Sequence, residues 1–296
     1  MKHSALTPPM RKLATMLESR TGQVLTEDRL WRLETSLRPV LRANGFEGLE
    51  ELVAAIAVDP NGPLARAATD ALVNNETSFF RDARVFRKIE QDLLPSLMAN
   101  PKHNGRPRTL RVWCAGCSTG QEAFSLAMLF ANNREAWPDW RLQILATDIS
   151  GTAVERARSG RVSQMDVQRG LAITDLLRWM VPAGDEWLFD RRLRAMIDFR
   201  VDNLLSPAAP LGEYDLILCR NVLLYFPSER KRQIFDLLAR HCSADGILLL
   251  GAGETILGHT EEFVASSKHR GAYERAQSPA GPSFPRQTVP PGPFPA

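Results

Sequence analysis

Four short polar segments each follow an apolar stretch of the sequence, and their residue types suit a binding site. The first is a turn of small residues, 116–120, and the others carry Asp148, Asn203 and the pair Arg220-Asn221. Small residues let the backbone approach a ligand closely, and an acid after a strand can accept hydrogen bonds from both ribose hydroxyls. Asn offers the donor and the acceptor that an adenine requires. Together these types indicate a nucleoside-bearing cofactor.

The motifs that the sequence lacks narrow the choice of cofactor. The 116–120 turn has neither the G-x-G-x-x-G of dinucleotide enzymes nor the G-x-x-x-x-G-K-[ST] of phosphate loops. A nucleoside held without a phosphate clamp matches S-adenosylmethionine, which becomes S-adenosylhomocysteine after methyl transfer. Two structural alternatives stay open: a purely structural left-handed turn at the glycines, and Asp148 as the N-cap of a helix that begins at Gly151.

A parallel sheet is expected to position these segments. Short apolar strands are predicted at residues 110–115, 142–147, 198–203, 214–219 and 246–250, and helices at 121–133, 151–158 and 229–241. Apolar strands that alternate with helices predict an α/β fold with a doubly wound, mostly parallel sheet. Ligands of such sheets bind at the carboxyl ends of the strands, where the four polar segments lie.

Three other regions accompany this sheet domain, which we place at residues 100–277. Residues 1–99 show helical periodicity alone and predict an N-terminal all-helical domain. An insertion is expected at about 167–201. It would comprise a helix at 167–180 and a small β-hairpin whose strands, 187–190 and 193–201, join at Arg191-Arg192. Residues 278–296 are rich in proline and predict a disordered tail.

The composition excludes several classes of protein. The 296 residues carry 37 Lys and Arg against 34 Asp and Glu, a balance too weakly basic to argue for nucleic acid. No apolar run approaches the roughly 18 residues of a membrane helix, and residues 1–10 lack the apolar core of a signal peptide. We therefore expect a cytoplasmic monomer without membrane insertion. The cysteines are expected to be reduced, and the single C-x-x-C, Cys114 and Cys117, has no second pair, so no metal is expected.

Five blocks of the sequence resemble the signature blocks of the bacterial chemoreceptor methyltransferase family, commonly called CheR. They lie at residues 74–82, 117–122, 146–149, 203–205 and 219–226, in the family's order and with similar spacing. The resemblance covers about residues 6–276; Gln121 and Ala123 depart from the usual Glu and Pro. It implies a Rossmann-like class I methyltransferase fold and transfer of a methyl group from S-adenosylmethionine to receptor glutamates, which gives γ-methyl esters.

The resemblance also implies roles for individual residues. The cofactor-binding residues would be Asn75, Thr77, Arg81, Gly116, Glu122, Asp148, Asn203, Leu204, Arg220 and Asn221. The catalytic residues would be Arg81, Arg220 and Tyr225, the last two near the acceptor. A glutamate carboxylate is already anionic at neutral pH, so positioning rather than a general base should supply the rate. Alternatively, Arg81 is a helix-end ion-pair partner of Asp82 or Glu90, whereas Phe79 and Phe80 are expected in the core.

The receptor would be recognised by the N-terminal helices. A predicted helix at residues 26–42, capped by Thr26, has apolar residues on one face and Arg29, Arg32, Arg38 and Arg42 on the other. We interpret this face as a docking surface for acidic receptor helices; a solvated arginine face is the alternative. Residues 180–187 contain one glycine where family members that bind a receptor tether have a glycine-rich loop, so recognition independent of a C-terminal tether peptide is expected.

Two rival functions differ from this interpretation. A nucleic-acid methyltransferase would show an Asn/Asp-Pro-Pro-Tyr motif or a Pro-Cys nucleophile, and the sequence has neither. A non-catalytic module that binds S-adenosylmethionine and signals through protein contacts is the other rival. Only a measurement of turnover separates that module from an enzyme.

Overall fold

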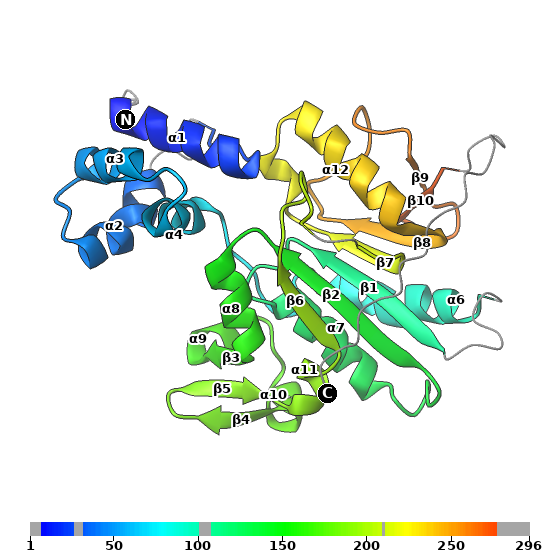
Figure 1. Ribbon diagram of the computed structural model, residues 1–296. Helices are drawn as coiled ribbons and strands as arrows, with labels where there is room; N and C mark the ends of the chain where they lie inside the picture. The colour runs from blue at the N-terminus through cyan, green and yellow to red at the C-terminus, as the bar shows by residue number, and fades with distance from the viewer. Residues whose placement is uncertain (1–6, 27–31, 101–107, 209–210, 277–296) are drawn as a thin grey trace.

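A seven-stranded sheet forms the centre of the molecule (Figure 1). The computed structural model describes residues 7–26, 32–100, 108–208 and 211–276. The predicted tail at 278–296 and Arg29 of the predicted docking face lie outside these residues.

The strand order of this sheet is β6-β2-β1-β7-β8-β10-β9. The strands are β1 (Thr109–Ala115), β2 (Arg141–Asp148), β6 (Ile197–Val201), β7 (Tyr214–Cys219), β8 (Cys242–Leu250), β9 (Phe263–Ala265) and β10 (Tyr273–Arg275). The first five pair in parallel, whereas β10 is antiparallel to β8 and β9. The predicted doubly wound, mostly parallel sheet is therefore confirmed, and β9 and β10 are strands that the sequence analysis missed.

Helices cover both faces of the sheet, which explains why its central strands contain runs of buried apolar residues. In β7, Leu216 and Leu218 enter one core cluster and Ile217 and Cys219 enter the other, because side chains alternate along a strand. The first cluster includes α7 (Gln121–Asn132), α8 (Gly151–Ser159), α5 (Ala83–Lys88), the π-helical turn η2 (Ile89–Leu93) and α6 (Leu94–Met98). The second includes α12 (Ser228–His241).

Four N-terminal helices form a separate layer at one side of the sheet (Figure 1). They are α1 (Pro8–Thr21), α2 (Arg32–Asn44), α3 (Leu49–Val58) and α4 (Pro63–Leu72), and they share a small core of their own. Residues 79–97 instead pack into the core of the sheet. The packing boundary thus lies near Val73 rather than at residue 99, because helical periodicity reveals an apolar face but not the core that the face joins.

The insertion differs from its prediction. It contains β3 (Arg161–Ser163), α9 (Gln164–Val167), α10 (Ile173–Trp179), β4 (Met180–Ala183), β5 (Glu186–Phe189) and α11 (Arg191–Arg194), with an antiparallel sheet of order β3-β5-β4. The single helix expected at 167–180 is wrong: it is interrupted around Gly170, whose φ is +94°. The hairpin expected across Arg191-Arg192 is also wrong, because α11 occupies that position and β6 joins the main sheet beside β2. The hairpin that does form joins β4 to β5.

Candidate active site

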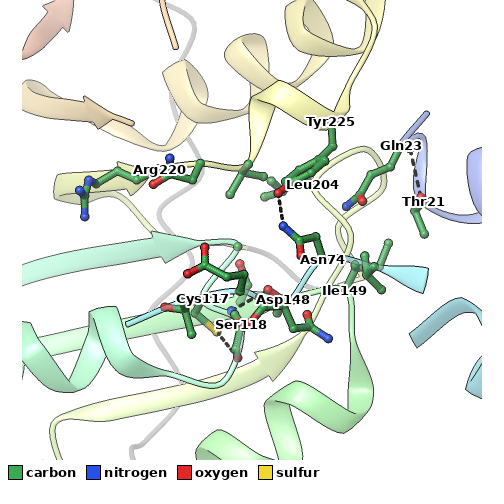
Figure 2. Close-up of a pocket in the computed structure, with 18 of the residues that line it drawn as sticks. Thr21, Gln23, Asn74, Cys117, Ser118, Asp148, Ile149, Leu204, Arg220 and Tyr225 are labelled. Carbon is green, nitrogen blue, oxygen red and sulfur yellow. Dashed lines mark hydrogen bonds between the residues drawn. The ribbon is translucent and has the colours of Figure 1, made fainter. Parts of the chain in front are cut away.

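One cleft at the carboxyl ends of β1, β2, β6 and β7 contains every residue that the sequence placed in the site (Figure 2). It encloses about 830 Å³, including the part open to solvent. The predicted residues in its lining are Asn75, Thr77, Arg81, Gly116, Glu122, Asp148, Asn203, Leu204, Arg220, Asn221 and Tyr225. The N-terminal layer adds Thr21 and Gln23, which sequence reasoning missed because they come close to the strand ends only in the folded chain.

The glycine turn after β1 is fixed against the neighbouring strand. The backbone N–H groups of Gly116 and Cys117 both donate to the carbonyl of Thr147, at 2.8 and 2.9 Å. Gly116 has a φ of +84°, and a Cβ there would lie 2.4 Å from Cγ2 of Val222. The left-handed turn is therefore a structural necessity, and it also forms one wall of the cleft.

Asp148 lies at the end of β2 with its carboxylate held by backbone groups. Its Oδ2 accepts from the Ser118 N–H at 2.7 Å and its Oδ1 from the Ser150 N–H at 2.9 Å. Burial raises the pKa of Asp148 above its ordinary value, although these hydrogen bonds oppose the shift. The alternative role as helix cap belongs to Ser150, whose Oγ accepts from the Ala153 N–H of α8. Each carboxylate oxygen can accept a second hydrogen bond, so Asp148 retains acceptor capacity in the cleft.

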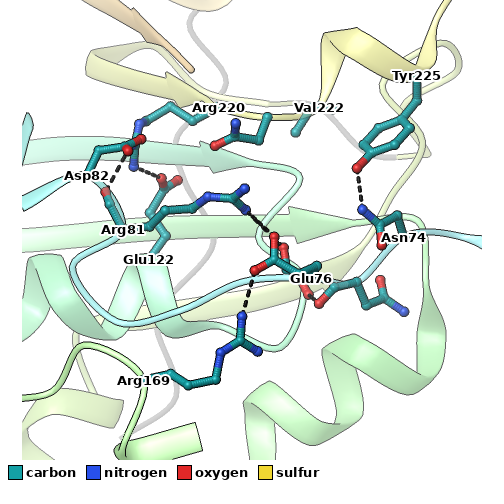
Figure 3. A network of polar contacts seen from close by, with 12 residues as sticks. Asn74, Glu76, Arg81, Asp82, Glu122, Arg169, Arg220, Val222 and Tyr225 are labelled. Atoms are coloured by element: carbon teal, nitrogen blue, oxygen red, sulfur yellow. Dashed lines mark hydrogen bonds and ion pairs between the residues drawn. The ribbon is translucent and has the colours of Figure 1, made fainter. Parts of the chain in front are cut away.

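Arg220 is the most deeply buried charge of the site (Figure 3). Its Nη1 donates to Oε2 of Glu122 at 2.8 Å, and its Nη2 donates to Oδ2 of Asp82 at 2.7 Å and to the Arg81 carbonyl at 2.9 Å. The side chain is 1% exposed. Burial raises the pKa of Glu122, and the neighbouring Arg220 opposes that shift. Arg220 thus ties the 81–82 turn to α7 beneath the cleft.

Arg81 has a different partner from the two that its sequence neighbourhood suggested. Its Nη1 lies 2.8 Å from Oε2 of Glu76, and Arg169 of the insertion contacts the other oxygen of Glu76 at 2.7 Å (Figure 3). The Arg81 side chain is 33% exposed, so it lies where a ligand can reach it. Phe79 lies in the core as expected and packs edge-on to Phe189, whereas Phe80 is only partly buried and packs against the core, edge-on to Phe86.

Glu254 organises the loop that follows β7, and the sequence analysis missed it. Its carboxylate accepts from four backbone N–H groups at 2.7–2.8 Å, those of Asn221, Val222, Leu223 and Gly251. Asn221 adopts a φ of +60°, which is unusual for a residue with a side chain. The sequence did contain a signal for Glu254, because it is an acid that comes shortly after a strand, β8. Asp148 was selected as a candidate on the same ground.

The residues of the cleft fit S-adenosylmethionine. Oδ1 of Asn221 is buried and has no hydrogen-bond partner among the described residues, so it can accept a hydrogen bond from a ligand. The carboxylates of Glu122 and Asp148 suit an ammonium group and ribose hydroxyls, and the Arg81 guanidinium suits a carboxylate.

Other chemistry has less support in the described residues. The four cysteines are free thiols, and burial raises the pKa of Cys114, Cys117 and Cys219 well above the ordinary value. Within the described ranges no three His, Cys, Asp or Glu side chains gather as a metal site would require. None of the described helices combines the length and apolar character needed to cross a membrane.

Comparisons with known proteins identify the family. Residues 75–272 match the family model described as CheR methyltransferase, SAM binding domain. The chain is 35% identical to chemotaxis protein methyltransferase 1 of Pseudomonas aeruginosa, over 86% of this chain and 92% of that protein. It is 32% identical to chemotaxis protein methyltransferase Cher2 of Pseudomonas putida, over 83% and 90%.

Among solved structures, a TehB-like SAM-dependent methyltransferase from Corynebacterium glutamicum aligns with 66% of this chain and 97% of its own, at 14% identity and a TM-score of 0.36. The fold is established by the strand order given above rather than by this alignment. The family model covers most of the chain, and the match to the relatives extends over nearly their full length. The chain therefore belongs to the CheR family of chemotaxis methyltransferases, with S-adenosylmethionine as its cofactor.

Proposed function

We propose that this protein is a protein-glutamate O-methyltransferase that forms γ-methyl esters on the cytoplasmic helices of methyl-accepting chemoreceptors. The observation that carries the proposal is the single cleft that gathers the predicted residues at the carboxyl ends of the parallel strands. When bound, S-adenosylmethionine supplies a methyl group that is activated by the adjacent sulfonium. The acceptor carboxylate is anionic at neutral pH, so the protein's task is to orient the reactants.

The cofactor roles follow from the chemistry of the lining. Asp148 accepts from the ribose hydroxyls, and Asn221 accepts from the adenine amino group through its unpartnered Oδ1. The Glu122 carboxylate attracts the ammonium group, and Arg220 keeps that carboxylate oriented and charged. Arg81 binds a carboxylate at the more exposed end of the cleft. These assignments place opposite charges at the ammonium and carboxylate groups, and hydrogen-bond acceptors at the ribose and adenine.

Thr77, Asn203 and Leu204 complete the proposed cofactor contacts from the edges of the cleft. Asn203 Nδ2 donates to the Arg20 carbonyl at the end of α1, at 3.2 Å. The Val24 N–H donates to the Tyr225 carbonyl at 2.9 Å. These two hydrogen bonds fasten the N-terminal layer to the mouth of the cleft, so a receptor helix held by this layer would lie beside Tyr225.

Receptor docking is proposed for the exposed arginines of α2. Arg38 and Arg42 are exposed, whereas Leu33 and Leu37 of the same helix are buried in the N-terminal core. Arg32 is only partly exposed and donates to Asn74, so it is not wholly available to a partner. The proposed partner is an acidic receptor helix near its methylated glutamates, bound by a monomeric enzyme.

The test is incubation of the full chain with labelled S-adenosylmethionine and receptor-containing membranes, followed by measurement of base-labile methanol. Label released by base identifies methyl esters, as expected for modified glutamate. A chain that binds S-adenosylhomocysteine but forms no such ester would be the non-catalytic signalling module. Binding is measured separately by calorimetry, so the two outcomes are distinct.

A further inference from the structure

Three side chains from three separate parts of the fold form a hydrogen-bonded chain that runs from Arg32 through Asn74 to Tyr225. Arg32 of α2 donates from Nη2 to Oδ1 of Asn74, at 2.8 Å. Asn74, in the segment between α4 and α5, donates from Nδ2 to the hydroxyl oxygen of Tyr225 (Figure 3). Tyr225 ends the short 3-10 helix η4 (Leu223–Tyr225) after β7. Asn74 and Tyr225 both line the cleft.

The chain has a defined direction. A guanidinium has only donors, so Arg32 requires that an oxygen of Asn74 face it. The same carboxamide then presents its N–H to Tyr225, whose oxygen must act as acceptor. The Tyr225 hydroxyl hydrogen is consequently oriented as a donor away from Asn74. Arg32 thus determines the donor direction of a hydroxyl that it does not contact.

We propose that Asn74 is a positioning residue for methyl transfer, which orients the Tyr225 hydroxyl to donate to the acceptor carboxylate. Tyr225 then holds one carboxylate oxygen while the other attacks the methyl carbon. The new O–C bond forms as the S–C bond breaks, the electron pair of the broken bond stays on sulfur, and no proton is transferred. This inference rests on the proposed glutamate methyltransferase function. It links the receptor-docking helix α2 directly to the acceptor side of the cleft.

The backbone of Tyr225 is anchored independently of this contact. Its N–H donates to the Val222 carbonyl at 3.3 Å, and its carbonyl accepts from Val24 at 2.9 Å. Leu223, two residues earlier, is held by Glu254. Loss of the Asn74 amide is therefore expected to remove this one hydrogen bond to the Tyr225 hydroxyl without unfolding the loop.

The decisive variant is Asn74→Asp. The new carboxylate is isosteric and still accepts from Arg32, but toward Tyr225 it can only accept. The Tyr225 hydroxyl would then donate to this carboxylate instead of to the substrate. We expect kcat on receptor-containing membranes to fall about tenfold, the loss of one hydrogen bond to a charged group. The KM for receptor and the affinity for S-adenosylhomocysteine should stay within about twofold.

Tyr225→Phe should cause a similar fall in kcat. Adding Asn74→Ala to Tyr225→Phe should lower kcat little further, because both changes remove the same hydroxyl contact.

Arg32→Ala and Arg38→Ala form a matched pair, since both remove one positive charge from α2. Arg32→Ala should lower kcat, whereas the exposed Arg38 should affect the KM for receptor alone.

A measurement without substrate is the NMR chemical shift of tyrosine Cζ in labelled protein. The chain has only 3 tyrosines, so few signals are expected. The Tyr225 signal, assigned by its loss in Tyr225→Phe, should shift in Asn74→Ala and Arg32→Ala but not in Arg38→Ala. Wild-type kcat in Asn74→Asp, or additive losses for Asn74→Ala and Tyr225→Phe, would overturn the inference while leaving the proposed function intact. A wild-type chain that forms no base-labile ester would overturn the proposed function itself.

Discussion

Arg220 and Glu122 form an ion pair beneath the cleft, with 2.8 Å between Nη1 and Oε2. The Arg220 side chain is enclosed by Glu122, Asp82 and the Phe86 ring, and its Nη atoms are occupied by protein acceptors. A residue bound in this way acts on the reaction through the groups that it holds. The family resemblance implies that Arg220 lies near the acceptor, and that direct role stays a prediction; the geometry favours a positioning role.

The first prediction concerns removal of this cation. Arg220→Met fills a similar volume but leaves Glu122 without its partner in a buried position. We expect a loss of about 3 kcal/mol in the free energy of unfolding, measured by urea denaturation, because breaking a buried pair leaves a charge uncompensated. The double variant with Glu122→Gln should recover part of the loss. Equal stability of the single variant and the wild type would show that the pair contributes nothing.

The second prediction is that Asp148 anchors the ribose. Asp148→Ala removes the acceptor for two hydroxyls, and hydrogen bonds to a charged group contribute about 1.5 to 3 kcal/mol. Calorimetric titration with S-adenosylhomocysteine should show this loss of affinity. Glu155→Ala is a suitable control, because Glu155 is an exposed carboxylate of α8 that does not line the cleft. Unchanged affinity in a folded Asp148→Ala variant would contradict the assignment.

The third prediction is an acid-dependent loss of binding. Burial raises the pKa of both Asp148 and Glu122. Each carboxyl is therefore protonated at a higher pH than usual, Glu122 above its ordinary pKa of 4.5 and Asp148 above its ordinary pKa of 3.8. Neutral carboxyls no longer attract the ammonium group or serve as charged acceptors. Affinity for S-adenosylhomocysteine should fall as the pH is lowered through this range, and Glu122→Gln should lose part of the dependence.

The stability of the chain should respond to these two groups in the opposite sense. A carboxyl whose folded-state pKa is raised binds protons more readily when folded, so its contribution to the free energy of unfolding increases as pH falls through the folded pKa toward the unfolded value. Urea denaturation at the same pH values separates the two effects. Affinity that falls only together with stability would show that unfolding, rather than protonation of the site, causes the loss.

Much of this architecture could be predicted because its causes are local. The strands β1, β2, β7 and the second half of β8 each contain a run of buried apolar residues, since helices cover both faces of the sheet. Asp148 ends β2 and Asn221 comes shortly after β7, so their places at the strand ends can be read from the sequence. The short strands β10 and β9, at one end of the sheet, have three residues each and only one buried side chain between them, so they lack an apolar pattern.

The parts that failed depend on tertiary contacts. Asn74 acts through Tyr225, a partner distant in sequence, to which local spacing gives no clue. The place of Glu254 shortly after β8 could be read from the sequence, but its contacts with the loop after β7 could not. Leu193 fits an alternating strand pattern, yet Asp190 accepts from the Arg192 N–H and begins a one-turn helix, α11, in its place. A short alternating pattern is compatible with both structures, and packing against the core decides between them.

The fourth prediction concerns docking of the receptor. Arg38→Glu with Arg42→Glu reverses two exposed charges on α2 and should raise the KM for receptor, with a weaker dependence of that KM on salt. Affinity for S-adenosylhomocysteine should not change, because neither residue lines the cleft. An equal loss of cofactor affinity would mean that this helix face is structural. Arg32 is unsuitable for this test, since its contact with Asn74 mixes docking with positioning.

The last prediction is that methylation does not require a C-terminal tether on the receptor. Peptide capture by an added strand needs an accommodating sheet edge. In the insertion, β4 is an edge strand, but it does not suit strand addition. It contains Pro182, which has no N–H to donate to an added strand. Only Gly184 and Asp185 separate β4 from β5, so no long loop extends this edge. The other edge, β3, has three residues.

Methylation rates should therefore be similar on receptors with and without their C-terminal extensions. The matched variant is Pro182→Val, which restores a backbone donor to β4 and should not slow methylation of either receptor form. The competing hypothesis is that the insertion binds a receptor tether of a different sequence. Strand addition depends mostly on main-chain contacts, so the tether sequence could differ. A large loss of rate on truncation of the receptor would establish that hypothesis, and the loss should then depend on the residues of β4 rather than on Arg38 and Arg42.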